Sequence, residues 1–363
     1  MNTAAFSILF IGYFLTTGTE FFVSDIAKVA FRSLALLIFL ANIVAQRSIR
    51  ARYILVLLLL YSILALNQSQ IAFNIVYLIL ISASMHRMSG KEVALSLLIP
   101  TVLVFGLHFV LLSTGQLSAQ ITEFSGRTRS TLGFTNANQA SAIYLSLVIL
   151  SVFTHIQYSK RASFFLMLFS YIMTLFVLLS TDSRTVMFAL PLLLMFQIFG
   201  FLFFRFKSYR RLLILMGALT PLIGSLVTFY LATTSDPILN IILSLRPYFF
   251  ALFIDSVSPY DFIFGWRPAD NSGVDNLYLM LLSGVGAVGF FFIILSGSYF
   301  IFRMDPRIIP LVVVLLIISV FESFLLRPEI PISALFLHLL FSDLWRRQKS
   351  MQLSLPVVRE ATQ

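Results

Sequence analysis

The chain of 363 residues contains no cysteine, which excludes disulfide bonds, thiol chemistry and cysteine metal sites. Charge is also scarce, since only 11% of the residues are Asp, Glu, Lys or Arg, whereas 59% are hydrophobic. The four histidines form no pair with the spacing of metal ligands, so no metal is expected. Residues 4–17 lack the basic leader and the cleavage site of a signal peptide, and we expect them to stay as a span. Little in this composition fits a soluble domain.

Apolar runs close to the roughly 20 residues that a bilayer-spanning helix needs recur along the whole chain. They predict an all-α, polytopic integral membrane protein with about twelve transmembrane helices. Residues 1–350 are expected to form a single membrane domain, and residues 351–363 a mobile cytoplasmic tail. The predicted spans are 4–18, 29–46, 52–66, 70–85, 92–113, 138–157, 163–180, 185–204, 212–231, 276–302, 308–326 and 332–345.

The charges are divided unevenly between the two sides of this topology. The side with both termini carries 17 of the 25 Lys and Arg residues but only four of the 15 acids. The positive-inside rule therefore places both termini in the cytoplasm of a bacterial cell, and it explains the net charge of +10 without nucleic acid. Counting 238–257 as another span reverses this bias, and Pro247 interrupts such a helix. We interpret 238–257 as interfacial helices in a large external loop over about 232–275.

Polar side chains of the external side gather in three stretches, 114–137, 181–184 and 232–275. In the first, Arg127 and Arg129 lie two residues apart. Guanidinium groups bind phosphate oxygens in a bidentate manner, which predicts an anion site, with solvated loop charges as the alternative. In the second, Arg184 closes a short turn at the membrane surface, where it is either used or paired with Asp182. In the third, Arg246 stands among apolar residues and needs a lipid headgroup or a partner in the protein.

Helix capping offers a second role for several of the other polar residues. Asn136 or Asn138 can cap the span that begins near 138, and Asp275 can cap the span that begins at 276. His108 and Glu322 lie near the external ends of their spans, where Glu322 is a candidate for a buried functional acid. The glycines of the segment 284–289 match a dinucleotide-binding pattern, but they lie inside a span and therefore predict close helix packing.

The order of these motifs resembles that of the O-antigen polymerase and ligase superfamily of bacterial membrane proteins, over about 70–345. The resemblance implies a glycosyltransferase without metal or other cofactor, facing the periplasm from the inner membrane. Its donor and acceptor are undecaprenyl-diphosphate-linked oligosaccharides, with membrane lipids and a chain-length regulator protein as further partners. The matching residues are Arg129-x-x-x-Gly133-Phe134-x-Asn136-x-Asn138, Asp182-Ser183-Arg184, Ser244-x-Arg246, Phe264-Gly265-Trp266 and Asp275-Asn276-x-Tyr278.

The resemblance also implies roles for individual residues. Arg129, Arg184 and Arg246 bind the diphosphate and stabilise its charge as it leaves. Asp275 is the leading candidate for the base that takes the proton of the acceptor hydroxyl. Ligases of the superfamily have a histidine at this place, which favours a polymerase of O-antigen, capsule or exopolysaccharide repeat units. Further substrate contacts are expected from Arg127, Arg267, Asn136, Asn138, Asn276, Tyr278, Glu322 and His108.

Two alternative functions remain. One is a ligase that transfers the finished glycan to lipid A core. The other is a transporter or glycolipid flippase with about twelve spans. Transporters tend to have similar halves and helices interrupted near the middle of the membrane. Here the charges gather outside, and the largest loop has no counterpart in the first half of the chain.

Overall fold

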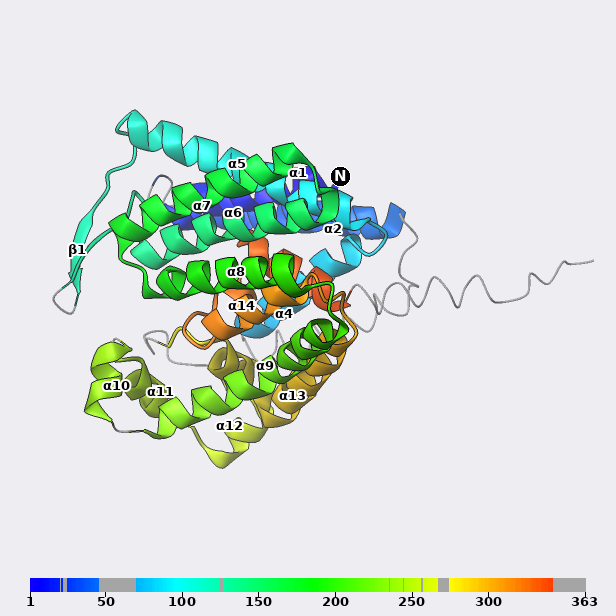
Figure 1. Cartoon of the computed structure of the whole chain (residues 1–363). Helices are drawn as coiled ribbons and strands as arrows, with labels where there is room; N and C mark the ends of the chain where they lie inside the picture. Colours follow the sequence, from blue (N-terminus) through cyan, green and yellow to red (C-terminus); the bar gives the residue numbers. More distant parts are fainter. Residues whose placement is uncertain are drawn as a thin grey trace, which may run out of the picture.

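The computed structural model describes residues 1–19, 21, 25–45, 70–124, 127–234, 236–243, 245–255, 257–266 and 274–341. In this part of the chain the protein is a bundle of helices with one two-stranded hairpin (Figure 1). The predicted span 52–66 and the predicted tail 351–363 lie outside the described residues.

The first half of the bundle runs from α1 to α7. Its elements are α1 (Asn2–Tyr13), the π-helical turn η1 (Phe14–Gly18), α2 (Asp25–Ala45), α4 (Gln70–Ser84), α5 (Gly90–Ser113), β1 (Ile121–Phe124), β2 (Arg127–Ser130), α6 (Ala137–Tyr158) and α7 (Arg161–Thr181). The second half contains α8 (Arg184–Phe203), α9 (Lys207–Thr233), α10 (Pro237–Ile242), α11 (Arg246–Asp255), α12 (Pro259–Phe264), α13 (Leu277–Phe302), α14 (Ile309–Ile318), η2 (Phe324–Leu326) and a last helix, Pro331–Phe341.

Seven of the described helices are long and apolar enough to cross a membrane, namely α2, α5, α6, α7, α8, α9 and α13. The protein is therefore a multi-pass helical membrane protein, as the apolar runs predicted. Four other predicted spans coincide with shorter helices: α1 with η1, α4, α14 and Pro331–Phe341. Of the roughly twelve predicted spans, the structure thus shows seven as helices long enough to cross a membrane.

The helix predicted over 308–326 ends at Ile318, well before the sequence pattern does. The last carbonyl groups of a helix need donors from elsewhere. Here the backbone N–H of Leu277 donates to the Ser319 carbonyl at 2.9 Å, and the Asn276 amide donates to the Val320 carbonyl. The residues at the start of α13 thus donate hydrogen bonds to the carbonyl groups that follow α14. The helix ends there, and residues 319–330 form a connection that contains Glu322, Arg327 and Glu329.

Helix α6 lies at the centre of the bundle, between α5, α7 and α8 (Figure 1). In the most apolar 18-residue stretch of α6, 83% of the residues are buried by the rest of the protein, against 22% in α7 and 28% in α8. Large apolar side chains such as Phe176, Phe188 and Phe201 remain exposed on α7 and α8. Because these outward faces have no partner in the protein, they are the faces that lipid covers.

Two glycines bring α12 and α13 into close contact. Gly286 interrupts α13 with a φ of +69°, and a Cβ atom there would collide with the carbonyl of Ile263. Gly265, with a φ of +94°, allows the N–H of Trp266 to donate to the Ser283 carbonyl at 2.8 Å. Only glycine adopts the Gly286 conformation readily. The glycine pattern at 284–289 therefore serves helix packing, as the sequence indicated.

The segment 238–257 forms short helices, α10 and α11, instead of a span. Helix α11 packs on α9, and the following α12 packs on α13. Neither α10 nor α11 approaches the length needed to cross a bilayer. Their placement on the membrane surface stays a prediction.

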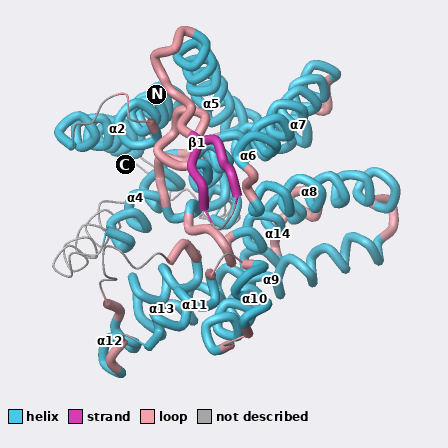
Figure 2. The backbone as a smooth tube through the Cα atoms, turned by 90° about the vertical axis from the view of Figure 1, so that its left-hand side faces the viewer, coloured by secondary structure: helices cyan, strands magenta, loops and turns pink. Residues whose placement is uncertain are grey.

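The connections that the charge pattern assigns to the outside lie together at one end of the bundle. In Figure 1 the hairpin, the α7–α8 turn and α10–α11 lie on the left, whereas the N-terminus and the α8–α9 connection lie on the right. Figure 2 looks onto the first of these ends and shows the hairpin across its middle. We call it the hairpin end, defined by β1, β2, 181–184, α10, α11 and the connection 319–330. The candidate site lies here.

Candidate functional site

A small polar cavity of about 40 Å³ opens at the hairpin end, between the start of α6, the residues before α13 and the connection 319–330. It has room for a water molecule or a small polar group. Larger cavities elsewhere in the described bundle are lined almost entirely by apolar side chains. Residues of the polar cavity are Asn136, Asn138, Gln139, Ala142, Asp275, Glu322, Phe324, Arg327 and Ile330.

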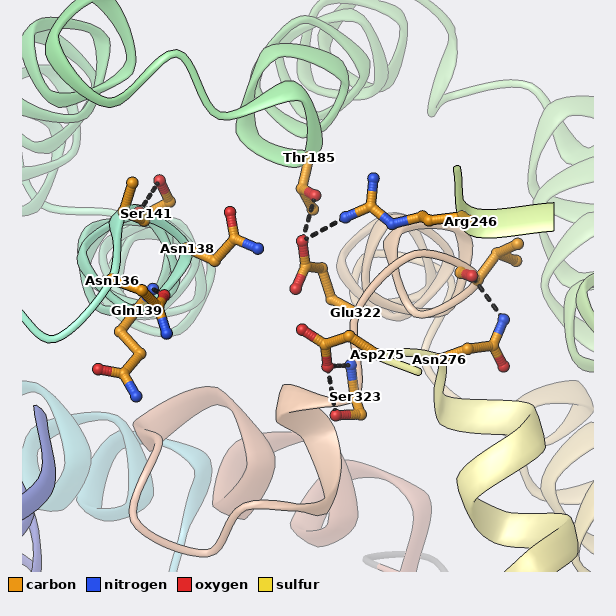
Figure 3. A network of polar contacts seen from close by, with 12 residues as sticks. Asn136, Asn138, Gln139, Ser141, Thr185, Arg246, Asp275, Asn276, Glu322 and Ser323 are labelled. Atoms are coloured by element: carbon orange, nitrogen blue, oxygen red, sulfur yellow. Dashed lines mark hydrogen bonds and ion pairs between the residues drawn. The ribbon is translucent and has the colours of Figure 1, made fainter. Parts of the chain in front are cut away.

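Glu322 is the most deeply buried acid of this site, with 3% of its surface exposed. Its Oε1 atom accepts a hydrogen bond from the Thr185 hydroxyl at 2.7 Å and one from Arg246 Nη2 at 3.1 Å (Figure 3). The Arg246 guanidinium also lies over the ring of Phe321, 5.7 Å from its centre. The sequence left two environments open for Arg246, a lipid headgroup or a partner in the protein. The structure shows the partner, Glu322. The contacts join α8, α11 and the connection 319–330.

Asp275 lies beside Glu322, immediately before α13 (Figure 3). Its Oδ1 atom accepts hydrogen bonds from the backbone N–H of Ser323 at 2.9 Å and from the Ser323 hydroxyl. The N-cap of α13 is the next residue, Asn276, whose Oδ1 atom accepts from the Leu279 N–H at 2.9 Å. Asp275 is therefore not the helix cap, and its carboxylate lines the cavity.

Asn276 is completely buried and holds the end of the bundle together. Its amide nitrogen donates to the Thr228 hydroxyl at 3.1 Å and to the Val320 carbonyl. Its side chain thus joins α9, α13 and the end of α14. Asn276 does not line the cavity itself. Its contacts fix the position of the neighbouring residue, Asp275, which does.

The pKa values of the two carboxyl groups are shifted in opposite directions. Burial raises the pKa of Glu322 well above its usual range, the nearby Asp275 raises it further, and the opposing effect of Arg246 is smaller. Burial also acts against ionisation of Asp275, but a hydrogen bond with Glu322, the charge of Arg327 and the Ser323 contacts outweigh it and lower the pKa of Asp275. Of the pair, Asp275 is therefore the carboxyl group that ionises first, and Glu322 is the one that keeps its proton to higher pH.

Arg129, on β2, ties the hairpin to the site. Its Nε atom donates to the Thr181 carbonyl at 2.9 Å, and its Nη2 atom donates to Asn138 Oδ1 at 2.7 Å. Asn136 is the cap of α6, since its side chain accepts from the Gln139 N–H at 2.9 Å. Asn138 lines the cavity (Figure 3), and Arg129 is bound to its Oδ1 atom.

Arg184 is the first residue of α8 and is half-buried next to Thr185, the donor to Glu322. The turn before it places Asp182 in the left-handed region, with a φ of +46°. Arg127 lies in β2 opposite Phe124. Its side chain and the whole of Arg267 lie outside the described residues.

His108 and Tyr278 lie away from the cavity. His108 is buried in α5, with Nε2 2.7 Å from the Leu132 carbonyl and Nδ1 2.9 Å from the Tyr144 hydroxyl. A carbonyl only accepts, so Nε2 carries the proton and Nδ1 accepts from Tyr144. The Tyr278 hydroxyl packs against Gly224 and donates to the Leu316 carbonyl at 3.3 Å. Both side chains join elements of the bundle, and their predicted contacts to substrate stay predictions.

Arg327 is a member of the site that the sequence motifs did not single out. It lines the cavity close to both Asp275 and Tyr13. Burial acts to lower its pKa, but the charge of Asp275 raises the pKa and keeps the guanidinium charged. Two residues later, Glu329 forms an ion pair with Arg32 of α2. The signal was the run Arg327-Pro328-Glu329, two charges that interrupt an otherwise apolar stretch.

The site thus combines a carboxyl pair with guanidinium groups on both sides, Arg246 on one and Arg327 on the other. In the described part of the chain, His, Asp and Glu residues form no group of three or more that could hold a metal ion. Comparisons with protein-family models, with curated proteins and with solved structures find no match to this chain. Fold and site therefore define a multi-pass helical membrane protein with a charged cavity at one end.

The raised pKa of Glu322 predicts a pH-dependent stability. Because the pKa of Glu322 is raised on folding, its contribution to stability is full below the usual pKa of a glutamate and is lost as the pH rises through the raised value. We expect the thermal unfolding temperature of the detergent-purified protein to fall across that window, and the variant Glu322→Gln, which cannot ionise, to lack this fall. Unfolding scans from about pH 5 to about pH 9 measure it. Identical profiles for the two proteins contradict the assignment.

Proposed function

We propose that the protein is a polymerase of lipid-linked oligosaccharide repeat units. The observation that carries the proposal is the placement of Arg246 and Arg327 beside the carboxyl pair of Asp275 and Glu322, with Arg129 bound to Asn138 of the same cavity. These residues come from four separate parts of the chain. Two of the motifs behind the family resemblance line the cavity, one through Asn136 and Asn138 and one through Asp275, and a third reaches it through the contact of Arg246 with Glu322. In this proposal the growing glycan passes from undecaprenyl diphosphate to the terminal sugar of an incoming lipid-linked unit.

The residues suit the chemistry of that transfer. The acceptor hydroxyl oxygen bonds to the anomeric carbon of the donor while the bond from that carbon to the diphosphate oxygen breaks. The diphosphate leaves with the electron pair, and guanidinium groups stabilise the charge that grows on it. The hydroxyl proton passes to Asp275, the ionised carboxylate that lines the cavity. Arg184, at the start of α8, is the further cation that the proposal assigns to the diphosphate.

The combination of a charged site with exposed apolar helix faces also supports a lipid-linked substrate. Guanidinium groups at the end of a bundle with exposed apolar faces are suited to a molecule with a charged head and a hydrocarbon tail. A buried carboxyl pair in which one group keeps its proton to higher pH is also what a proton-coupled transporter requires. This observation makes a transporter the second candidate.

The test is to incubate the purified protein with a lipid-diphosphate-linked repeat unit from its own host and to separate the glycans on a gel. We expect a ladder of lipid-linked products without lipid A core. Transfer that appears only after lipid A core is added identifies a ligase instead. If neither product forms, but protein in liposomes moves the lipid-linked unit when a pH gradient is applied, the transporter is correct.

A further inference from the structure

A second, apolar cavity begins where the charged site ends. It has a volume of about 360 Å³ and lies among α4, α9, α13, α14, η2 and the helix Pro331–Phe341. Its lining starts at Leu277 and Tyr278, the residues that follow Asp275 and Asn276. It also includes Leu325 and Leu326, the residues that precede Arg327. The linings of the charged site and the apolar cavity therefore adjoin along the chain at two places, before α13 and after η2.

The apolar cavity follows α13 on both sides of its interruption at Gly286. Its lining includes Leu277, Tyr278 and Leu281 before the interruption and residues between Phe292 and Ile301 after it, and on the last helix it reaches Phe341. Because α13 is long and apolar enough to cross a membrane, these residues place the cavity within the membrane.

The cavity also has an opening towards lipid. Phe292 belongs to its lining and is 72% exposed on the outer face of α13. A hydrocarbon chain can therefore enter sideways from the bilayer without passing the polar end. Nearly all of the lining is apolar, so a hydrocarbon chain loses no hydrogen bonds by entering.

We infer that this cavity binds the polyprenyl tail of the lipid carrier, with the phosphate groups at Arg327 and Arg246. The inference rests on the proposed function, which supplies a carrier with such a tail. The alternative cavity, of about 590 Å³ among α6, α7, α8 and α14, has no such continuity with the site. It is lined by Arg307 and by Ser159, beside Lys160, and so lies at the opposite end of the bundle.

The direct test is photolabelling of the unaltered protein in detergent. The probe is undecaprenyl monophosphate with a diazirine on its tail, followed by mass spectrometry of the labelled peptides. We expect label on α13 and on Pro331–Phe341. Label confined to α7 and α8 overturns the inference. Competition with an excess of phosphatidylglycerol distinguishes a site for the polyprenyl carrier from a general phospholipid site. If phosphatidylglycerol displaces the probe as efficiently as unlabelled undecaprenyl monophosphate does, the site is a general one and the inference is overturned.

Three glycines provide matched variants. A Cβ atom at Gly297, Gly200 or Gly106 meets nothing within 4 Å, so a side chain can begin at each of these positions in open space. Gly297 lines the cavity proposed for the tail, Gly200 lines the other large cavity, and Gly106 is exposed on α5.

Gly297→Phe is expected to lower labelling about tenfold, the loss that follows when about two methylene groups no longer find an apolar wall. Gly200→Phe and Gly106→Phe are expected to label as the unaltered protein does. Gly297→Leu is the milder variant if Gly297→Phe does not fold. Equal labelling of the Gly297 and Gly106 variants overturns the inference.

The polymerase assay separates this inference from the proposed function. Labelling of α13 in a protein that makes no ladder supports the cavity while the proposed function fails. A ladder together with label outside the cavity supports the proposed function and overturns the inference about the cavity. If both hold, Gly297→Phe is expected to raise the KM for the lipid-linked unit with little change in kcat, because the tail binds equally in the ground and transition states.

Discussion

Asp275→Asn is expected to abolish polymer formation while the protein remains folded and inserted in the membrane. Asparagine has the size of aspartate and still accepts the hydrogen bonds from Ser323, so the local structure is retained. It cannot take the proton of the acceptor hydroxyl, and loss of a general base lowers rates by about 10²- to 10⁴-fold. The measurement is the initial rate of ladder formation, beside detergent size-exclusion as the test of folding.

Asp305→Asn is the matched control for this variant. Asp305 lies at the other end of the bundle, where its carboxylate pairs with Arg307 at 2.7 Å on the surface. It loses the same charge without touching the cavity, and we expect its rate to equal that of the unaltered protein. A ladder of normal length and rate from Asp275→Asn would falsify the assignment of Asp275 as the base.

Arg246→Ala is expected to have the second largest effect, a fall of about 10²- to 10³-fold in the rate of transfer, the loss typical of one transition-state hydrogen-bond donor. In the proposed function the guanidinium stabilises the charge of the leaving diphosphate, and in the structure it binds Glu322 at 3.1 Å. Arg246→Lys keeps the charge but lacks the planar fork, so an intermediate rate is expected. Rates with the lipid-linked unit, measured over a range of substrate concentrations, separate binding from turnover.

A double variant distinguishes the two roles of Arg246. Above the raised pKa of Glu322, Arg246→Ala leaves an ionised carboxylate without the cation at its Oε1 atom, whereas Glu322→Gln removes the charge that needs that cation. At such a pH we expect the double variant to regain the thermal stability of the protein but not its activity. Recovery of activity in the double variant contradicts a role at the diphosphate and reduces Arg246 to a structural partner of Glu322.

Much of the architecture could be predicted because a bilayer imposes strong rules on sequence. Apolar length alone located the seven long helices, and the distribution of Arg and Lys indicated which connections lie together. The early end of α14 at Ile318 could not be predicted, since the mostly apolar pattern continues to Leu326. That early end depends on donors from Asn276 and Leu277, which are more than forty residues away in the sequence.

Most members of the site were predicted, but not their contacts. Asp275 and Glu322 were candidates that line the cavity, and Arg129 and Arg246 were candidates that bind lining residues, whereas Arg327 was missed. Capping remained open because neighbouring residues, Asp275 and Asn276, suit a helix start equally well. The choice depends on which side chain points along the helix and which into the cavity, a matter of register that composition does not contain.

The enclosed position of α6 has a consequence for how the protein is made. Ser141, Ser146 and Thr154 donate to carbonyl groups four residues earlier in the same helix, so these hydroxyls are satisfied without any neighbour. Helix α6 can therefore leave the translocation machinery on its own, although it has the lowest mean hydropathy of the seven long helices. Its main neighbours α5 and α7 adjoin it in the chain. The half of the site that contains Arg129 and Asn138 is thus assembled during synthesis, before the ribosome has produced the acids that complete it.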